Sequence, residues 1–146
     1  MLSYLQMRSF ALMDELTLEF FEGLNVLTGE TGAGKSILIG AINLILGERA
    51  SSEQVRTGSE LALIEAVFNV NPDYEELIRA MEMYGIPFDD EIVIRREISR
   101  SGRNTCRVNG RIIPLAALKD IGNVLVDLHG QHSQQSLLKT EQHINV

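Results

Sequence analysis

The sequence predicts an α/β fold in which an antiparallel β portion lies beside a core built from a strand, a glycine-rich loop and a helix. The loop, residues 29–36, stands between an apolar run at 23–28 and an almost wholly apolar helical stretch at 37–46. Ahead of these, residues 1–10 and 15–20 alternate apolar and polar side chains, which is typical of strands with one exposed face. Two strands joined by a short connection favour antiparallel pairing, so we expect them to form a sheet next to the core.

The glycine-rich loop matches the pattern G-x-x-x-x-G-K-[ST], which holds the phosphates of a nucleoside triphosphate. Glycines let successive backbone N–H groups turn inward around phosphate oxygens, and the following helix directs its positive N-terminal end at the same anion. Lys35 is expected to reach the β- and γ-phosphates, and the Ser36 hydroxyl to bind Mg²⁺. The alternative is an ordinary glycine-rich turn before a core helix. The predicted binding residues are Gly29, Glu30, Thr31, Gly32, Ala33, Gly34, Lys35 and Ser36.

The rest of the chain predicts further strands, two helices and a tight hairpin. Gly47 stands where a glycine commonly ends a helix, and residues 48–59 fit a loop. Asn109-Gly110 between two short runs is a strong hairpin signal. The predicted strands are residues 61–70, 91–99, 105–108, 111–113 and 124–126, and the predicted helices are residues 74–84 and 114–121.

Composition limits the class of protein. The 146 residues suit a single domain or one piece of a larger one, and no apolar run is long enough to span a membrane. The single cysteine, Cys106, cannot form an internal disulfide and fits a small buried apolar residue. Residues 1–10 read as a strand rather than as a secretory signal, so a reducing cytoplasm is the expected location.

Charge is unevenly distributed along the chain. The net charge is −7, but residues 95–111 hold six arginines and one acid, Glu97, which gives a local charge of +5. Such a cluster could line a nucleic-acid backbone, with Arg95 and Arg107 on one strand face. The alternative is a solvated or salt-bridged face that is balanced by the acidic helix at 73–82. The candidate DNA contacts are Arg95, Arg100, Arg103, Arg107 and Arg111.

Hydrolysis of the bound nucleotide requires an acidic residue that holds Mg²⁺ at the end of an apolar strand. Asp127 follows the predicted strand 124–126, but Leu128 stands where a second acid is needed. One alternative is therefore a self-contained small NTPase or phosphotransferase that uses Asp127; the other is that Asp127 begins a polar loop. In that loop, His129 and Gln131 could reach the γ-phosphate or Mg²⁺.

Five stretches together resemble one family much more specifically than the phosphate loop alone. The chain is similar to the N-terminal part of RecN, a bacterial double-strand-break repair ATPase family related to SMC (structural maintenance of chromosomes) proteins. The stretches that carry the resemblance are Phe10-Ala11-Leu12-Met13-Asp14, Leu27-Thr28-Gly29-Glu30-Thr31-Gly32-Ala33-Gly34-Lys35-Ser36, Leu46-Gly47-Glu48-Arg49-Ala50, Val108-Asn109-Gly110-Arg111 and Leu128-His129-Gly130-Gln131-His132.

The resemblance implies an ABC-type ATPase head that is split by a long antiparallel coiled coil. Residues 1–146 would form its first lobe, with the phosphate loop and a Q-loop, while the signature motif, the Mg²⁺-binding aspartate and the catalytic glutamate would lie in a second lobe. It therefore implies that no catalytic set is complete in this chain and that Asp127 does not hold the metal. The family's Q-loop glutamine usually precedes the glycine, where this chain has His129, so His129 and Gln131 both stay candidates.

For the whole protein, the resemblance implies that ATP and Mg²⁺ are sandwiched between two heads of a homodimer. ATP binding and hydrolysis would switch head engagement and association with DNA during repair and recombination, in the cytoplasm at the nucleoid. This chain alone is expected to bind ATP with little hydrolysis, because half of the groups that position and stabilise the reaction would be in the second lobe. An alternative of another class is a DNA-binding module in which the nucleotide only stabilises the fold.

Overall fold

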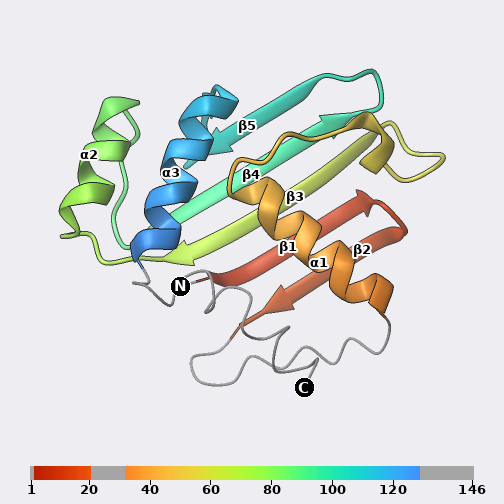
Figure 1. Cartoon of the computed structure of the whole chain (residues 1–146), viewed down its shortest axis with the longest axis horizontal. Helices are drawn as coiled ribbons and strands as arrows, with labels where there is room; N and C mark the ends of the chain where they lie inside the picture. The colour runs from red at the N-terminus through yellow and green to blue at the C-terminus, as the bar shows by residue number, and fades with distance from the viewer. Residues whose placement is uncertain (1, 21–31, 129–146) are drawn as a thin grey trace.

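The computed structural model describes residues 2–20 and 32–128 (Figure 1). The strand predicted at 23–28, the loop residues Gly29, Glu30 and Thr31, and the segment that contains His129 and Gln131 lie outside the described residues. Within the described ranges, the chain forms one six-stranded sheet and three α-helices.

The sheet is antiparallel throughout, and its strands lie in the order β2-β1-β3-β4-β5-β6. The hairpin of β1 and β2 pairs with β3 from a later part of the chain, so the N-terminal strands are built into the sheet. The strands are β1 (Leu2–Phe10), β2 (Met13–Glu19), β3 (Leu61–Asn69), β4 (Glu91–Ser99), β5 (Asn104–Val108) and β6 (Arg111–Ile113). The strands predicted in these regions are confirmed to within two residues at each end.

The helices cover one face of this sheet. Helices α1 (Gly32–Ile45) and α3 (Leu115–Leu128) lie over the near face in Figure 1, and α2 (Glu75–Met83) lies beside α3. The loop that follows α1 contains a single short 3-10 turn, η1 (Ser52–Gln54). Residues 48–59 therefore form the predicted loop, with this turn in the middle.

Side-chain alternation decides which face is buried. On β4, Ile92, Ile94 and Ile98 are fully buried, while Val93, Arg95 and Glu97 alternate with the buried positions and reach the opposite face. Helix residues such as Leu44 and Leu118 are equally buried against these strands. The core therefore lies between the sheet and the helices, and it fixes the position of α1 over the strands.

Helix α1 ends at a glycine, as predicted. Gly47 has a φ of +107°, a left-handed conformation that residues with a side chain rarely adopt. The Gly47 N–H donates to the carbonyl of Leu44 at 3.1 Å, and the Glu48 N–H donates to the carbonyl of Asn43 at 3.0 Å. This pair of hydrogen bonds is the Schellman pattern of helix termination.

The Asn-Gly hairpin is also confirmed. Asn109 and Gly110 have φ values of +49° and +83°, as the two-residue turn between β5 and β6 requires. The Asn109 side chain accepts a hydrogen bond from the Val93 N–H at 2.8 Å and donates to the Pro87 carbonyl at 2.9 Å. The turn residue therefore also fastens the start of β4.

The predicted strand at 124–126 is wrong, because α3 continues through it to Leu128. Residues on one side of this helix are buried in the core, which stabilises a helix through a Val-Leu-Val run whose local preference is for a strand. The fully buried residues are Ala117, Leu118, Ile121 and Leu125.

Gly122 stands in the middle of α3 and does not end the helix. A Cβ atom at this position would collide with the main-chain carbonyl of Leu46, which follows α1. Gly122 therefore lets α3 approach the end of α1 closely, and this contact positions the two helices against one another.

Candidate phosphate site and its surroundings

The second half of the phosphate-loop motif forms the first turn of α1. The helix begins at Gly32, somewhat earlier than the start near Lys35 that the sequence indicates, and Ser36 follows as an exposed residue. The first turn contains no acidic residue, and N–H groups at a helix N-terminus have no carbonyl partner within the helix. The turn therefore has N–H donors without a partner inside the helix, together with the positive end of the helix dipole, and such an arrangement suits phosphate binding.

The opposite end of α1 is held by a buried arginine. Nη1 of Arg96, on β4, donates to the Leu44 carbonyl at 2.8 Å and also to the Glu48 carbonyl. Arg96 is only 1% exposed. A cation at a helix C-terminus is stabilised by the negative end of the helix dipole. Arg96 thus fixes one end of the helix whose other end contains the predicted phosphate-loop residues from Gly32 to Ser36.

Sequence reasoning counted Arg96 only as one member of the basic cluster and missed this role. The sequence did contain an indication that Arg96 is buried. Arg96 stands midway between Ile94 and Ile98, two positions from each, and alternate residues of a strand share a face. Cys106 lies opposite Arg96 on β5 and is buried, which confirms its predicted place in the core.

Burial shifts the pKa of both Arg96 and Cys106. Burial lowers the pKa of Arg96, against the opposing effect of Cys106 and Glu48. Burial raises the pKa of the Cys106 thiol, and the neighbouring Arg96 only partly offsets this. The thiol is therefore protonated at neutral pH.

The structure brings the predicted arginine stripe together but pairs its members with carboxylates. Arg95 and Arg107 are direct cross-strand partners on the sheet face opposite the helices. Nη1 of Arg95 lies 3.6 Å from Oε2 of Glu65, and Arg107 forms an ion pair with Glu97. The neutralising acids are thus on β3 and β4, and the acidic helix at 73–82 is not the partner that the sequence suggested.

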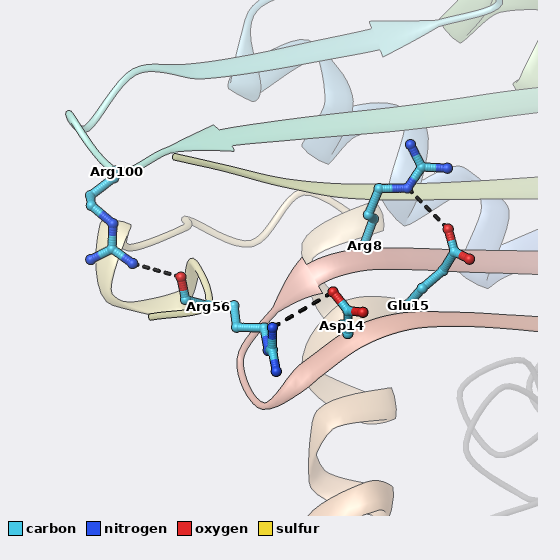
Figure 2. Close-up of polar contacts among 5 residues, drawn as sticks. All are labelled: Arg8, Asp14, Glu15, Arg56 and Arg100. Atoms are coloured by element: carbon cyan, nitrogen blue, oxygen red, sulfur yellow. Dashed lines mark hydrogen bonds and ion pairs between the residues drawn. The ribbon is translucent and has the colours of Figure 1, made fainter. Parts of the chain in front are cut away.

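Arg100 is engaged by the chain's own backbone. Its Nη2 donates to the Arg56 carbonyl at 2.7 Å (Figure 2). Its Nε donates to the Ser59 carbonyl at 2.8 Å, and its Nη2 also donates to the Val55 carbonyl at 3.3 Å. Three hydrogen bonds from one guanidinium hold the loop after η1 against the end of β4. Arg100 therefore has a structural role in this loop.

The same loop is fastened to the first hairpin. The Arg56 N–H donates to the Ser9 carbonyl at 2.8 Å, and Nη1 of Arg56 lies 3.6 Å from Oδ1 of Asp14 (Figure 2). Within the hairpin, Nε of Arg8 lies 3.2 Å from Oε2 of Glu15. These contacts join three segments that are far apart in the sequence.

Arg103 and Arg111 differ from the other candidate DNA contacts. Both are exposed, and no residue in the described part of the chain accepts a hydrogen bond or an ion pair from either side chain. Within residues 2–20 and 32–128, they are the two cations of the predicted set that are exposed and have no partner.

Asp127 does not occupy the position that a magnesium-binding aspartate requires. It lies exposed in the last turn of α3, so the strand-end position predicted for it in a self-contained NTPase is wrong. Among residues 2–20 and 32–128, no three His, Cys, Asp or Glu side chains converge in a way that could hold a metal ion. None of the helices in the same ranges is long and apolar enough to cross a membrane.

Comparison with known proteins places the chain in a family. The family model described as "AAA domain" matches residues 2–142. The chain is 48% identical to the DNA repair protein RecN of Halalkalibacterium halodurans over all of its own length and 26% of that protein. It is also 48% identical to the DNA repair protein RecN of Bacillus subtilis, of which it covers 25%. The chain thus spans about a quarter of the length of these relatives.

A solved structure supports the same assignment. The fold is similar to that of an SMC ATPase structure, with a TM-score of 0.64 and 25% identity over 94% of this chain and 90% of that one. The resemblance to RecN that the sequence motifs indicate is confirmed, as is the predicted head-like α/β fold. The chain belongs to the AAA domain family.

Proposed function

We propose that this chain is the ATP-binding lobe of an ABC-type ATPase head that works in DNA double-strand-break repair. The observation that carries the proposal is its 48% identity to RecN along the whole chain, together with a complete phosphate-loop pattern. The likeness to an SMC ATPase supports it, because that structure concerns ATP-driven dimerization and DNA-stimulated activation.

The described part of the motif fits a bound polyphosphate. The first turn of α1 has no acid that would repel an anion, and Ser36 is exposed there. In this proposal, backbone N–H groups from Gly29 to Gly34 bind the phosphates, Lys35 compensates their charge and the Ser36 hydroxyl is a ligand of Mg²⁺. ATP with its Mg²⁺ supplies the phosphoanhydride that is cleaved. His129 and Gln131 remain the candidates for contacts on the γ-phosphate side.

The proposal divides the work of hydrolysis between two parts of the protein. Catalysis of phosphoryl transfer depends on positioning and charge stabilisation by several groups around the γ-phosphate. With Asp127 exposed on α3, the described residues supply no metal-binding aspartate at a strand end. We therefore assign the signature motif and the catalytic carboxylates to a second lobe of the whole protein, and the sandwiching of ATP to a pair of heads.

Association with DNA completes the proposal. The whole protein would act as a homodimer in the cytoplasm, at the nucleoid, and nucleotide binding would switch head engagement and DNA association. Within this chain, Arg103 and Arg111 are the cations best placed to contact phosphate, because Arg95, Arg100 and Arg107 are already bound to other groups of the protein. No described feature favours a purely DNA-binding module in which the nucleotide is only structural.

The first experiment compares ATP binding and turnover by the wild-type chain, Lys35→Ala and Asp127→Asn. Wild type is expected to bind ATP and to show negligible turnover. Lys35→Ala is expected to lose most of the binding, because the charge on the β- and γ-phosphates is no longer compensated. Asp127→Asn is the matched control and is expected to bind ATP like wild type, since Asp127 is exposed on α3.

Two results would contradict the proposal. Rapid turnover by the isolated chain would mean that it holds a complete catalytic set. Unchanged ATP binding by Lys35→Ala would mean that the glycine-rich loop is not the phosphate site.

A further inference from the structure

The turn between β5 and β6 contains two neighbouring residues that can react with one another. Asn109 is the one asparagine of the sequence that is followed directly by glycine. Glycine has no side chain to shield its own main-chain nitrogen, so this nitrogen can attack the side-chain amide carbon of the asparagine before it. An Asn-Gly pair is therefore the sequence position at which an asparagine most readily loses its side-chain amide.

The attacking nitrogen is accessible in the structure. A two-residue hairpin turn is closed by the N–H of the residue that follows it, here Arg111, which pairs with Val108. The ladder therefore does not use the N–H of Gly110. Gly110 is also exposed, so water can take up the proton that its nitrogen must lose.

The side-chain amide of Asn109, in contrast, is held by two hydrogen bonds. Its Oδ1 accepts from the Val93 N–H at 2.8 Å, and its Nδ2 donates to the Pro87 carbonyl at 2.9 Å. We call these two bonds the Asn109 clasp. The main-chain N–H of Asn109 adds a third bond, to the Val93 carbonyl at 2.8 Å. The amide has to leave both partners of the clasp before its carbon can meet the Gly110 nitrogen.

We propose that Asn109 is a deamidation site that the fold keeps closed and that reacts when the Asn109 clasp opens. The Gly110 nitrogen loses its proton to water or hydroxide and bonds to Cγ of Asn109. The Cγ–Nδ2 bond breaks, and Nδ2 takes up a proton from water and leaves as ammonia. Water then opens the resulting succinimide ring. Opening at the main-chain carbonyl gives an isoaspartate at position 109, and opening at the side-chain carbonyl gives an aspartate.

Neither product can restore the clasp. A carboxylate has no N–H group, so it cannot donate to the Pro87 carbonyl and instead places two acceptors against one another. The residues Asp89, Asp90 and Glu91 follow shortly after Pro87, so a further negative charge is unfavourable there. An isoaspartate also lengthens the main chain of a turn that requires exactly two residues. Deamidation therefore releases the β5–β6 turn from the start of β4, and the change is irreversible.

The test follows deamidation of this chain by peptide mass spectrometry, with chromatography to separate aspartate from isoaspartate. The wild-type chain is incubated at mildly alkaline pH, either folded or unfolded in guanidinium chloride. Deamidation at Asn109 is expected to be at least about tenfold slower in the folded chain, because the two hydrogen bonds of the clasp must be broken first. Asn104, which precedes a threonine, is the internal control and is expected to react much more slowly than Asn109 in the unfolded chain.

Variants separate the clasp from the stability of the whole fold. Pro87→Gly loosens the segment that accepts the Nδ2 bond, and it is expected to raise the deamidation rate about two- to fivefold. Gly122→Ala is the control, because it disturbs the contact between α3 and Leu46 and leaves the clasp in place. It is expected to leave the rate unchanged.

Hydrogen exchange of the Val93 amide measures opening of the clasp directly, since this N–H is bonded to Oδ1 of Asn109. The deamidation rate is expected to rise in proportion to the Val93 exchange rate, both across the variants and in wild type at rising guanidinium chloride below the unfolding transition. The wild-type series keeps the test valid if Pro87→Gly does not fold. Equal deamidation of folded and unfolded chains, or deamidation that does not follow Val93 exchange, would overturn the proposal. A rate that rises with Gly122→Ala but not with Pro87→Gly would overturn it as well.

Discussion

Nη1 of Arg96 in the middle of the sheet lies 2.8 Å from the main-chain oxygen of Leu44 near the end of α1. This contact joins the buried face of β4 directly to the helix that contains part of the predicted phosphate loop at its other end. A second bond from the same nitrogen to the Glu48 carbonyl reaches beyond the helix end. Arg96 therefore adds a second donor to the Leu44 carbonyl, which also accepts the Gly47 N–H, and gives a donor to the Glu48 carbonyl just beyond the helix.

Replacing Arg96 by Ala is expected to lower the free energy of unfolding by about 3 kcal/mol. The change removes a charged donor from the buried Leu44 carbonyl and the partly buried Glu48 carbonyl, and it leaves a cavity under α1. Urea denaturation of the chain measures the difference. Arg79→Ala is the control, with an expected change below about 0.5 kcal/mol, because Arg79 makes only an exposed pair with Glu75. Similar losses for the two variants would show that Arg96 does not brace the helix.

Two glycine substitutions in helices are expected to act in opposite directions. Gly122→Ala should destabilise the protein by about 1–3 kcal/mol, because the added Cβ collides with the Leu46 carbonyl. Gly40→Ala should stabilise it by about 0.5–1 kcal/mol, because Gly40 is inside α1 and nothing lies within 4 Å of the added methyl group. Thermal and urea unfolding of both variants test this pair. A neutral Gly122→Ala would mean that α3 does not approach α1 as closely as the structure describes.

Stability is expected to fall as pH rises through the titration of Cys106. Burial raises the pKa of this thiol in the folded protein above that of the exposed thiol in the unfolded chain. The folded state therefore holds the proton more tightly, and the stabilisation is complete below the ordinary thiol pKa of about 8.5 and declines above it. Cys106→Ala removes this contribution. Urea denaturation between about pH 8 and 9.5, below the range where tyrosines titrate, should give a flatter pH dependence for the variant. Parallel pH profiles would contradict the prediction.

Charge reversal at Arg103 and Arg111 is expected to weaken DNA binding by the chain. Each lost phosphate contact also reduces the slope of log affinity against log salt by about one. Fluorescence anisotropy at low salt, with a labelled duplex, measures both effects. Arg79→Glu on α2 serves as the control for net charge. If Arg79→Glu weakens binding as much as the Arg103→Glu/Arg111→Glu double variant, the interaction is a general charge effect and these two arginines form no DNA site.

Local patterns were sufficient for much of the fold. Alternation along residues 91–99 defines β4, because a strand with one buried face has a period of two. The turn at Asn109-Gly110 follows from the positive φ values that a two-residue hairpin needs, and the end of α1 follows from Gly47 for the same reason. The phosphate-loop pattern and its family resemblance were likewise readable from consecutive residues.

Other features depend on partners that are remote in the sequence, so only the tertiary structure decides them. The run at 124–126 prefers a strand locally, yet burial of Leu125 against the core extends α3 through it.

The basic cluster looks uniform as a sequence, but packing gives its arginines different surroundings. Arg96 is buried, Arg95 and Arg107 pair with carboxylates, Arg100 bonds to the backbone, and Arg103 and Arg111 are exposed. The sequence by itself determined the family, the phosphate-loop pattern and most strands, because these are encoded in contiguous residues. The tertiary structure decided which charges remain free, because a charge is neutralised by whichever acceptor the fold brings to it.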